Sequence, residues 1–548
     1  MHTYYEATPR VSLSGALICG GTCLQKTKEL TMTVEGQRDG SLDTGSTPVY
    51  STKEAVAMMM QQPLFCDILR LFRGIGLVIK MSFFKDNKLF GNGKFYINAL
   101  SIAVPIMLQA LIQSLVSLVD NFMVAGLGDV SMAGVNVSGQ ILFVFFVFIN
   151  SICMAGGIFM TQFFGAKDSS GMQQAFRFKL IFGFLAFIPY FLVCIVFPKQ
   201  VIYLMLNGNL QRDLILPEAV SYIRLMFFMG PQLTFSLSAA SSFRDLGRVK
   251  FPLVVTIIAT LTNTLFNWLL IYGNLGFPAL GVKGAAIATV IARSLEFVIF
   301  AIALLVKKPE FSVKIKEFFK VDGKLIKEIF KKGSLVLFCE MVWIASETIT
   351  SWIFNGRGGA EVVSGMSAGF AIANLFFVAF GGIYSATQVV IGKTLGEGNL
   401  DKARTEKTWL LSGSAIFGVI MMLFGFLTVL IVPFVFGKLS AEAITICTRM
   451  VILMAILTPV WVYMNSQTAI ARAGGDTMMG AIADALITIF IMIPMLLGLG
   501  FLTSVGPVEI YLCVKLLDVV KVIVFTFWLK KERWLKNLTV KEESNESA

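Results

Sequence analysis

From about residue 95, apolar residues form near-continuous blocks of about 20 or more, separated by short polar segments. Blocks of this length predict membrane-spanning α-helices, whereas the strands of a membrane β-barrel would alternate over about ten residues. The pattern predicts an all-α polytopic membrane protein with twelve transmembrane helices. The expected spans are 96–124, 132–163, 176–198, 216–242, 251–273, 282–306, 333–356, 362–391, 408–436, 442–470, 478–501 and 508–530.

Composition supports a chain that lies mostly within the bilayer. Hydrophobic residues make up 56% of the sequence and charged residues 15%, whereas soluble domains carry about 25% charged residues. Backbone polar groups inside lipid are satisfied only in helices or closed barrels, which agrees with a helical bundle.

The net charge of +12 is explained by membrane orientation rather than by nucleic-acid binding. If the N-terminus is cytoplasmic, the cytoplasmic loops and the C-terminal tail carry about 25 Lys and Arg, against about four or five in the opposite loops. We therefore predict that both termini are cytoplasmic and that nucleic acid is not a partner.

Polar segments divide the chain into five parts. They are a polar N-terminal extension (1–94), a first lobe of six spans (95–306), a basic cytoplasmic linker (307–332), a second lobe of six spans (333–531) and a cytoplasmic tail (532–548). For the extension, two explanations stay open: a disordered segment, or a natural start at Met81 with the upstream residues misread.

The two lobes resemble each other at a shift of about 230 residues. VAGLGDVSMAGVN parallels FNGRGGAEVVSGMS, and a Pro, an Arg and a Gly recur at one constant shift. The matching positions are Pro231, Arg244 and Gly247 with Pro459, Arg472 and Gly475. Because each lobe has an even number of spans, the repeats have the same orientation, which is one plan of secondary transporters with a central cavity.

Asp120 is a carboxylate inside the first apolar span. A charged group there costs a few kcal/mol, so it normally faces a cavity or a partner and suggests a functional site. Pro105, earlier in the same span, removes a backbone hydrogen bond and favours a kinked helix that can act as a hinge.

Amides at helical spacing accompany this carboxylate. Asn263 and Asn267 are four residues apart and share a face of the fifth span, and Gln113 shares a face with Asp120 seven residues later. If the two helices meet, amide oxygens surround the carboxylate, a set suited to Na⁺ or to a protonatable Asp. The alternative is that these polar groups only join neighbouring helices.

Further charged residues lie in the second lobe. Glu340 and Glu347 are seven apart on one face of the seventh span. Two pairs three residues apart, Arg293/Glu296 and Lys515/Asp518, are interpreted as intrahelical ion pairs that neutralise buried charge.

Several chemistries are disfavoured. The one histidine is His2, so no histidine lies in the spans to bind a metal or shuttle protons. The eight cysteines form no close pairs, and no phosphate-binding loop indicates ATP use. An integral membrane enzyme such as an acyltransferase remains an alternative, but we expect no catalytic residues and no cofactor.

The ordered set of motifs across residues 95–540 resembles the multidrug and toxic compound extrusion (MATE) transporters, in the prokaryotic branch. The segments that carry the resemblance are Pro105 with Asp120, VAGLGDVSMAGV, TQFFGAKD, SSFRDLGRVKFPL, NTLFNWLLIYG, GVKGAAIATVIARSLE and the stretch from YLCVKLLD to WLKNLT.

The resemblance implies a cation-coupled antiporter whose two six-helix lobes form a V-shaped cleft. Such proteins expel amphipathic, often cationic organic compounds across the bacterial inner membrane in exchange for H⁺ or Na⁺. In archaeal-type members an ion site joins an Asp, an Asn, a second Asp and a Thr, which here correspond to Asp120, Asn263, Asn267 and Thr289. Because Asn267 replaces a carboxylate, attraction for Na⁺ is weaker and the balance moves slightly toward H⁺.

Substrate contacts are expected in the second lobe. The resemblance favours Glu340 as a functional seventh-helix Glu, and Glu347 and Trp343 complete the expected substrate site, with Trp343 available for cation–π contact. We expect a monomer in the lipid bilayer that binds small amphipathic substrates. A flippase for an anionic lipid-linked precursor, from the same superfamily, is the alternative and requires a strongly basic cavity.

Overall fold

The computed structural model describes residues 89–207, 211–357, 359–430, 432–436 and 439–540. The chain divides into two compact units, Met1–Ile75 and Gly76–Ala548, and every described residue belongs to the second. The expectations for the N-terminal extension, including a start at Met81, therefore lie outside the described residues, apart from its last six positions.

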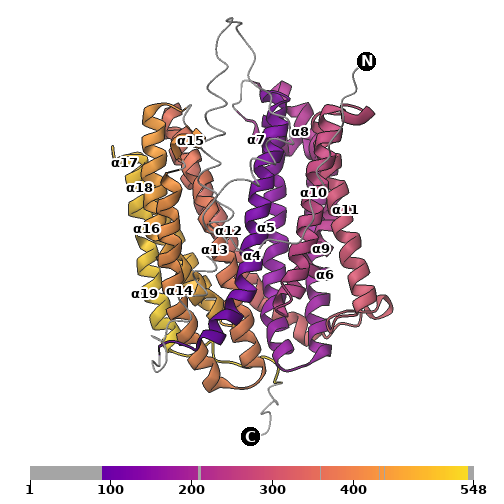
Figure 1. The fold of residues 1–548 in the computed structure, drawn as a ribbon, viewed down its shortest axis with the longest axis vertical. Coiled ribbons are helices and arrows are strands. Elements are labelled where there is room, and N and C mark those ends of the chain that lie inside the picture. The colour runs from indigo at the N-terminus through magenta and orange to yellow at the C-terminus, as the bar shows by residue number, and fades with distance from the viewer. Residues whose placement is uncertain (1–88, 208–210, 358, 431, 437–438, 541–548) are drawn as a thin grey trace, which may run out of the picture. The chain divides into compact units, whose positions relative to one another are not determined.

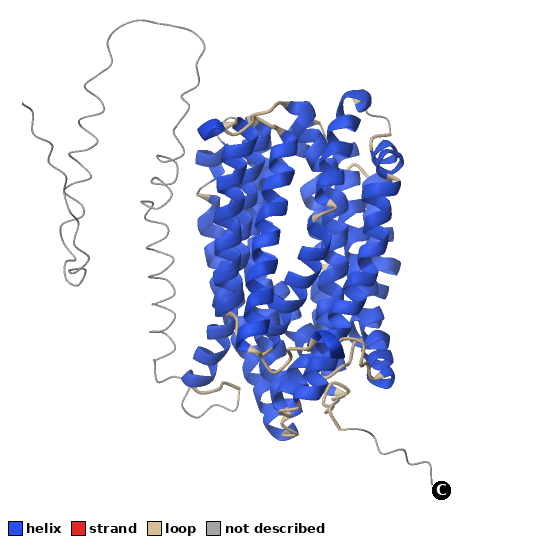
Figure 2. Ribbon diagram, turned by 90° about the vertical axis from the view of Figure 1, so that its right-hand side faces the viewer, coloured by secondary structure: helices blue, strands red, loops and turns tan. Residues whose placement is uncertain are grey.

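Helices make up all the regular structure of the described ranges (Figure 2). The first half contains α4 (Gly93–Ala125), α5 (Asp129–Gly165), α6 (Ser169–Phe191), α7 (Pro198–Met205), α8 (Arg212–Met226), α9 (Met229–Asp245), α10 (Lys250–Tyr272) and α11 (Val282–Lys307). The second half contains α12 (Gly323–Arg357), α13 (Ala360–Gly396), α14 (Leu400–Val429), α15 (Val432–Phe436), α16 (Ala441–Ala473), α17 (Ile493–Leu502), α18 (Pro507–Lys515) and α19 (Leu517–Lys530). Short π-helical segments are η2 (Leu192–Val196), η5 (Gly480–Ala485) and η6 (Thr488–Met492), and 3₁₀ turns are η3 (Asn274–Gly276) and η4 (Ile315–Glu317).

Ten described helices are long and apolar enough to cross a membrane, or eleven if a bent pair counts as one span. The predicted all-α membrane fold is confirmed. The last predicted span, 508–530, corresponds to α18 and α19 in succession. At the linker, α12 begins at Gly323, so the helix extends ten residues into the segment predicted as a linker.

One predicted span, 216–242, is wrong as a single continuous helix. The structure divides it into α8 and α9, which meet at an angle of 51°. Pro231 lies in the first turn of α9 and has no N–H to bond the carbonyl of Phe227, where the break occurs. The proline identified as a repeat marker therefore also sets the bend.

The internal repeat is visible in helix bounds. α5 and α13 each have 37 residues, and both ends differ by the same shift (360 − 129 = 231 and 396 − 165 = 231). The turns after α9 and α16 each place a glycine at positive φ, Gly247 at 72° and Gly475 at 74°. In Figure 1 the helices of the first half (violet to magenta) and of the second half (orange to yellow) gather on different sides.

The first helix of each half also contacts the other half. Near the start of α4, Tyr96 donates to the Trp409 carbonyl at 3.0 Å, and Ala103 and Met107 join a core cluster with residues of α13, α14 and α16. Its second part packs in the first-half core through Met123 and Val124. In the same way α12 packs against α5 and α6. Thus α4 passes from one helical bundle to the other.

Candidate functional site

The C-terminal part of α4 meets α10 and α11 around Asp120. Asn267 donates from Nδ2 to Asp120 Oδ1 at 2.8 Å. α10 ends at Tyr272 and is followed by Gly273, whose φ of 74° lies in the left-handed region, and a short turn then leads back into α11. This return places Thr289 beside Asn263. The structure thus brings together four of the five residues expected at the ion site: Asp120, Asn263, Asn267 and Thr289.

The Asn263 amide can face either side of this group. In one orientation its Nδ2 donates to Thr289 Oγ1 at 3.3 Å and its Oδ1 accepts from Asn267 at 3.4 Å. With nitrogen and oxygen exchanged, it donates to Asp120 Oδ2 at 2.8 Å and Oδ1 at 3.3 Å. The second orientation gives both amide atoms suitable partners, so the carboxylate is held by two amide donors.

A buried oxygen at this site has no hydrogen-bond donor. Asn267 is 2% exposed, and its Oδ1 has no partner in the described part of the chain. Such an atom normally requires a donor or a cation. Arg293 of α11 interacts electrostatically with Asp120, but its guanidinium is bound to Glu296 at 2.6 Å. The predicted Arg293/Glu296 pair is confirmed.

Gln113 is not brought into this group. Its side chain is exposed, and no hydrogen bond joins it to Asp120 among the described residues. The buried amide of α4 is instead Gln109, which donates to Thr256 Oγ1 of α10 at 2.8 Å. Pro105 lies inside α4, which remains one continuous helix there, in the stretch where its contacts change from one bundle to the other.

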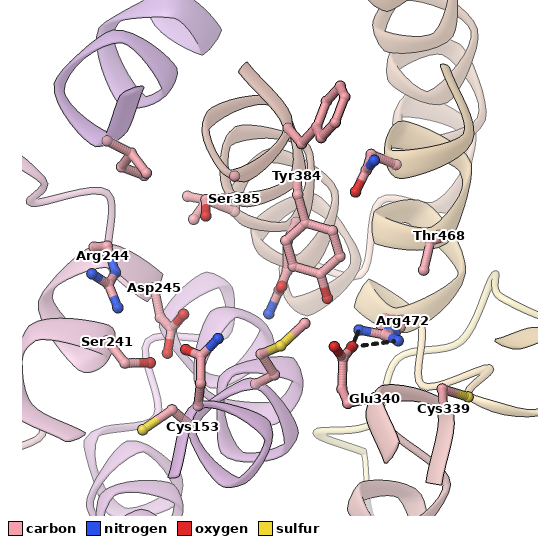
Figure 3. A pocket seen from close by; sticks show the side chains of 18 of the residues that line it. Cys153, Ser241, Arg244, Asp245, Cys339, Glu340, Tyr384, Ser385, Thr468 and Arg472 are labelled. Carbon is pink, nitrogen blue, oxygen red and sulfur yellow. Dashed lines mark hydrogen bonds and ion pairs between the residues drawn. The ribbon is translucent and has the colours of Figure 1, made fainter. Parts of the chain in front are cut away.

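A second feature is a cavity of about 620 Å³ between the two halves. Its walls come from α4, α5 and α9 on one side and from α12, α13, α16 and η5 on the other (Figure 3). Glu340 and Trp343 both line this cavity, and Trp343 is 50% exposed. Arg472 contacts Glu340 Oε1 with two guanidinium nitrogens, each at 3.3 Å.

Glu347 is not among the residues that line the cavity. Its carboxylate binds Lys515 Nζ at 2.9 Å. The predicted Lys515/Asp518 pair is therefore wrong. Residues three apart in sequence face each other only within one continuous helix. Here α18 ends at Lys515 and α19 begins at Leu517. Asp518 instead accepts from Trp461 Nε1 at 2.8 Å and pairs with Lys521 Nζ at 3.6 Å.

The sequence interpretation missed a buried ion pair beside the cavity. Lys179 of α6 is fully buried and binds Asp245 Oδ2 at 2.5 Å, Ser241 at 3.0 Å and Ser242 at 3.2 Å. A signal was present, because Lys179 falls inside the predicted third span, where an unpaired ammonium would be costly.

Two repeated helical bundles, a carboxylate site in one and a cavity between them define the class of secondary membrane transporters. The comparisons specify the family. The MatE family model matches residues 105–269 and again 337–496, and the chain belongs to the MatE family. The double match also agrees with the internal repeat.

Known proteins of this kind cover most of the chain. The "Uncharacterized transporter YisQ" of Bacillus subtilis is 25% identical over 355 residues, 63% of this chain and 76% of that protein. The "Probable multidrug resistance protein NorM" of Thermotoga maritima is 25% identical over 336 residues, 59% and 69% of the two chains. A crystal structure of MATE in the bent conformation superposes with a TM-score of 0.70 at 18% identity, over 81% of this chain and 96% of that one. The chain is a transporter and not an enzyme, as predicted.

Proposed function

We propose that the protein is an antiporter that exports amphipathic organic compounds across the bacterial inner membrane in exchange for H⁺ or Na⁺. Family membership supports transport, and the name of the Thermotoga relative supports multidrug efflux. The observation that carries the coupling is the Asp120 carboxylate, held by two asparagines beside an oxygen without a donor. The protein works as a monomer with both termini in the cytoplasm.

The residues at Asp120 fit a monovalent cation. One carboxylate, two amide groups and the Thr289 hydroxyl supply only oxygen atoms to a hard ion. An asparagine can present either its N–H₂ or its carbonyl to Asp120 by a half-turn of the amide. Without the ion, the N–H₂ groups stabilise the negative charge. With Na⁺ bound, or with Asp120 protonated, the carbonyl oxygens become the better partners.

Coupling acts through α4. Asp120 lies in the C-terminal part of α4, and the N-terminal part of the helix packs against second-half helices. A change of contacts at Asp120 therefore shifts a helix that both bundles share, with Pro105 as the hinge. The ion drives the change only as far as its affinity differs between the two shapes of α4.

Substrates bind in the central cavity. Its volume of about 620 Å³ falls within the range of small-molecule sites. Trp343 offers a ring face, and Glu340 can attract a cationic group when it is released from Arg472. Glu347 contributes only if its bond to Lys515 opens.

Export of an anionic lipid-linked precursor is the second candidate. It requires a strongly basic cavity, and the lining contains two arginines against three carboxylates. These residues are Arg244 and Arg472 with Asp245, Glu340 and Asp484. The mixed charge favours amphipathic organic compounds.

The test measures ethidium movement in proteoliposomes under a proton gradient or a sodium gradient imposed separately. One gradient should drive transport by the wild-type protein, and Asp120→Asn should abolish that transport while the folded protein is retained in size-exclusion chromatography. Unchanged transport by Asp120→Asn would contradict the assignment of the ion site. Gln113→Leu serves as the control on the same helix and should keep most of the activity.

A further inference from the structure

Arg244 differs from the other charged residues of the cavity. It lies in the last turn of α9 and its guanidinium lines the cavity (Figure 3). In the described ranges, no hydrogen bond or ion pair joins it to another side chain. A guanidinium lining a membrane-embedded cavity without a partner is unusual, because buried charges are normally paired.

The carboxylates near Arg244 are already occupied. Asp245 interacts with it electrostatically but is bound to Lys179 Nζ at 2.5 Å. Glu296 also acts on Arg244 and is bound to Arg293 at 2.6 Å. Each of these two carboxylates is thus bound to another base, and neither forms an ion pair with Arg244.

Each remaining carboxylate of the cavity wall is also bound by a base. Glu340 is bound by Arg472, and Asp484 is bound by Lys521 Nζ at 2.7 Å. None of the three lining carboxylates therefore remains for Arg244. Its charge is available to a molecule that enters the cavity.

The opposite wall suits an aromatic body. Trp343 is half exposed, and Phe380 lies on the same side of the cavity. The Tyr384 ring lies on this side as well, with its centroid 5.8 Å from the guanidinium carbon of Arg472 (Figure 3). Rings on one side and a free guanidinium on the other match a molecule with an aromatic body and a compact anionic group.

We propose that Arg244 is the anion-binding residue of the substrate cavity and that the substrates include aromatic carboxylates. The guanidinium donates two parallel hydrogen bonds to the carboxylate, while the aromatic body lies against Trp343 and Phe380. The inference rests on the proposed function in one respect only, that this cavity is the substrate cavity.

Binding to the purified full-length protein tests the inference without transport. Isothermal titration compares naphthalene-2-acetate with naphthalene-2-acetamide, which has nearly the same shape and no charge. The wild-type protein should bind the carboxylate more tightly. Arg244→Gln should weaken carboxylate binding roughly tenfold or more and leave amide binding almost unchanged. Arg244→Lys should restore part of the difference.

Arg248→Gln is the matched control, because it removes the same charge four residues away, where Arg248 pairs with Glu310 outside the cavity. It should not alter either affinity. Equal binding of carboxylate and amide by the wild-type protein, or equal weakening of both by Arg244→Gln, overturns the inference. If carboxylate binding depends on Arg244 while neither ion gradient drives ethidium transport, the anion site stands and the proposed cation-coupled export is contradicted.

Discussion

At the scale of single residues, the site around Asp120 depends on which faces of α4 and α10 meet. Asn263 and Asn267 are one turn apart, so they necessarily act together on Asp120. On α4, positions seven and eleven residues before Asp120 both lie near its face. Gln113 was expected at the site, but the buried amide is Gln109, which donates to α10. Which of the two glutamines is buried depends on where α10 packs against α4.

In the proposed ion site, we expect Asn267 to weaken the preference for Na⁺. Asn267→Asp would place a second carboxylate against Asp120, where the amide nitrogen now lies 2.8 Å from Oδ1. Two adjacent carboxylates repel each other unless a cation or a proton lies between them. We predict that NaCl raises the melting temperature of Asn267→Asp by several degrees relative to KCl, and that the wild-type protein responds less. An equal response of both proteins would contradict this role of Asn267.

At the scale of helices, α5 and α13 approach each other closely at their ends. A Cβ built on Gly165 would lie 2.0 Å from the Lys393 carbonyl oxygen, and one on Gly396 would lie 1.9 Å from the Gln162 carbonyl oxygen. The contacts are reciprocal, as expected for two repeats related by an approximate dyad. Glycine at both positions permits a backbone contact that any larger residue would prevent.

Gly165→Ala should therefore separate the ends of α5 and α13. With spin labels at Ser170 and Lys402 in a cysteine-free background, we expect the distance distribution to move to longer values and ethidium transport to fall. Gly139→Ala is the control on α5, because a Cβ there meets nothing within 4 Å. If Gly165→Ala gave the same distances as the unsubstituted protein, the contact would not hold these helices together.

Hydropathy and residue spacing alone did not reveal two breaks within helices. Hydropathy predicted 216–242 as one span, since Pro231 does not lower the apolar content that defines a span. The interruption after Lys515 likewise converts an expected intrahelical pair into a bond from α18 to Glu347 of α12. Both expectations treated a stretch of the chain as one unbroken helix.

At the scale of the whole described unit, the repeat and the order of spans were predictable from the sequence. The contacts that α4 and α12 each make with the other half were not. Packing partners of a helix that is apolar on several faces are not specified by its own sequence.

The C-terminal segment was also more structured than expected. Trp534 is fully buried, and Gln162 of α5 binds backbone groups of Ala473, Lys536 and Leu538. Hydrogen bonds from Arg404 lower the pKa of Glu532 in the same segment. Part of the predicted tail thus joins the two halves.

Competition between ion and substrate tests the central claim most directly. In an antiporter, substrate binding and ion binding oppose each other, and by linkage each ligand lowers the affinity for the other. Substrate binding should therefore release the coupling ion. Purified protein in weakly buffered or ²²Na⁺-equilibrated detergent solution is mixed with saturating ethidium, and the released H⁺ or Na⁺ is measured. The account predicts release of about one ion per wild-type molecule and none from Asp120→Asn, since one carboxylate holds the ion. Equal release from both proteins, or ethidium binding by the wild type without any release, would contradict it.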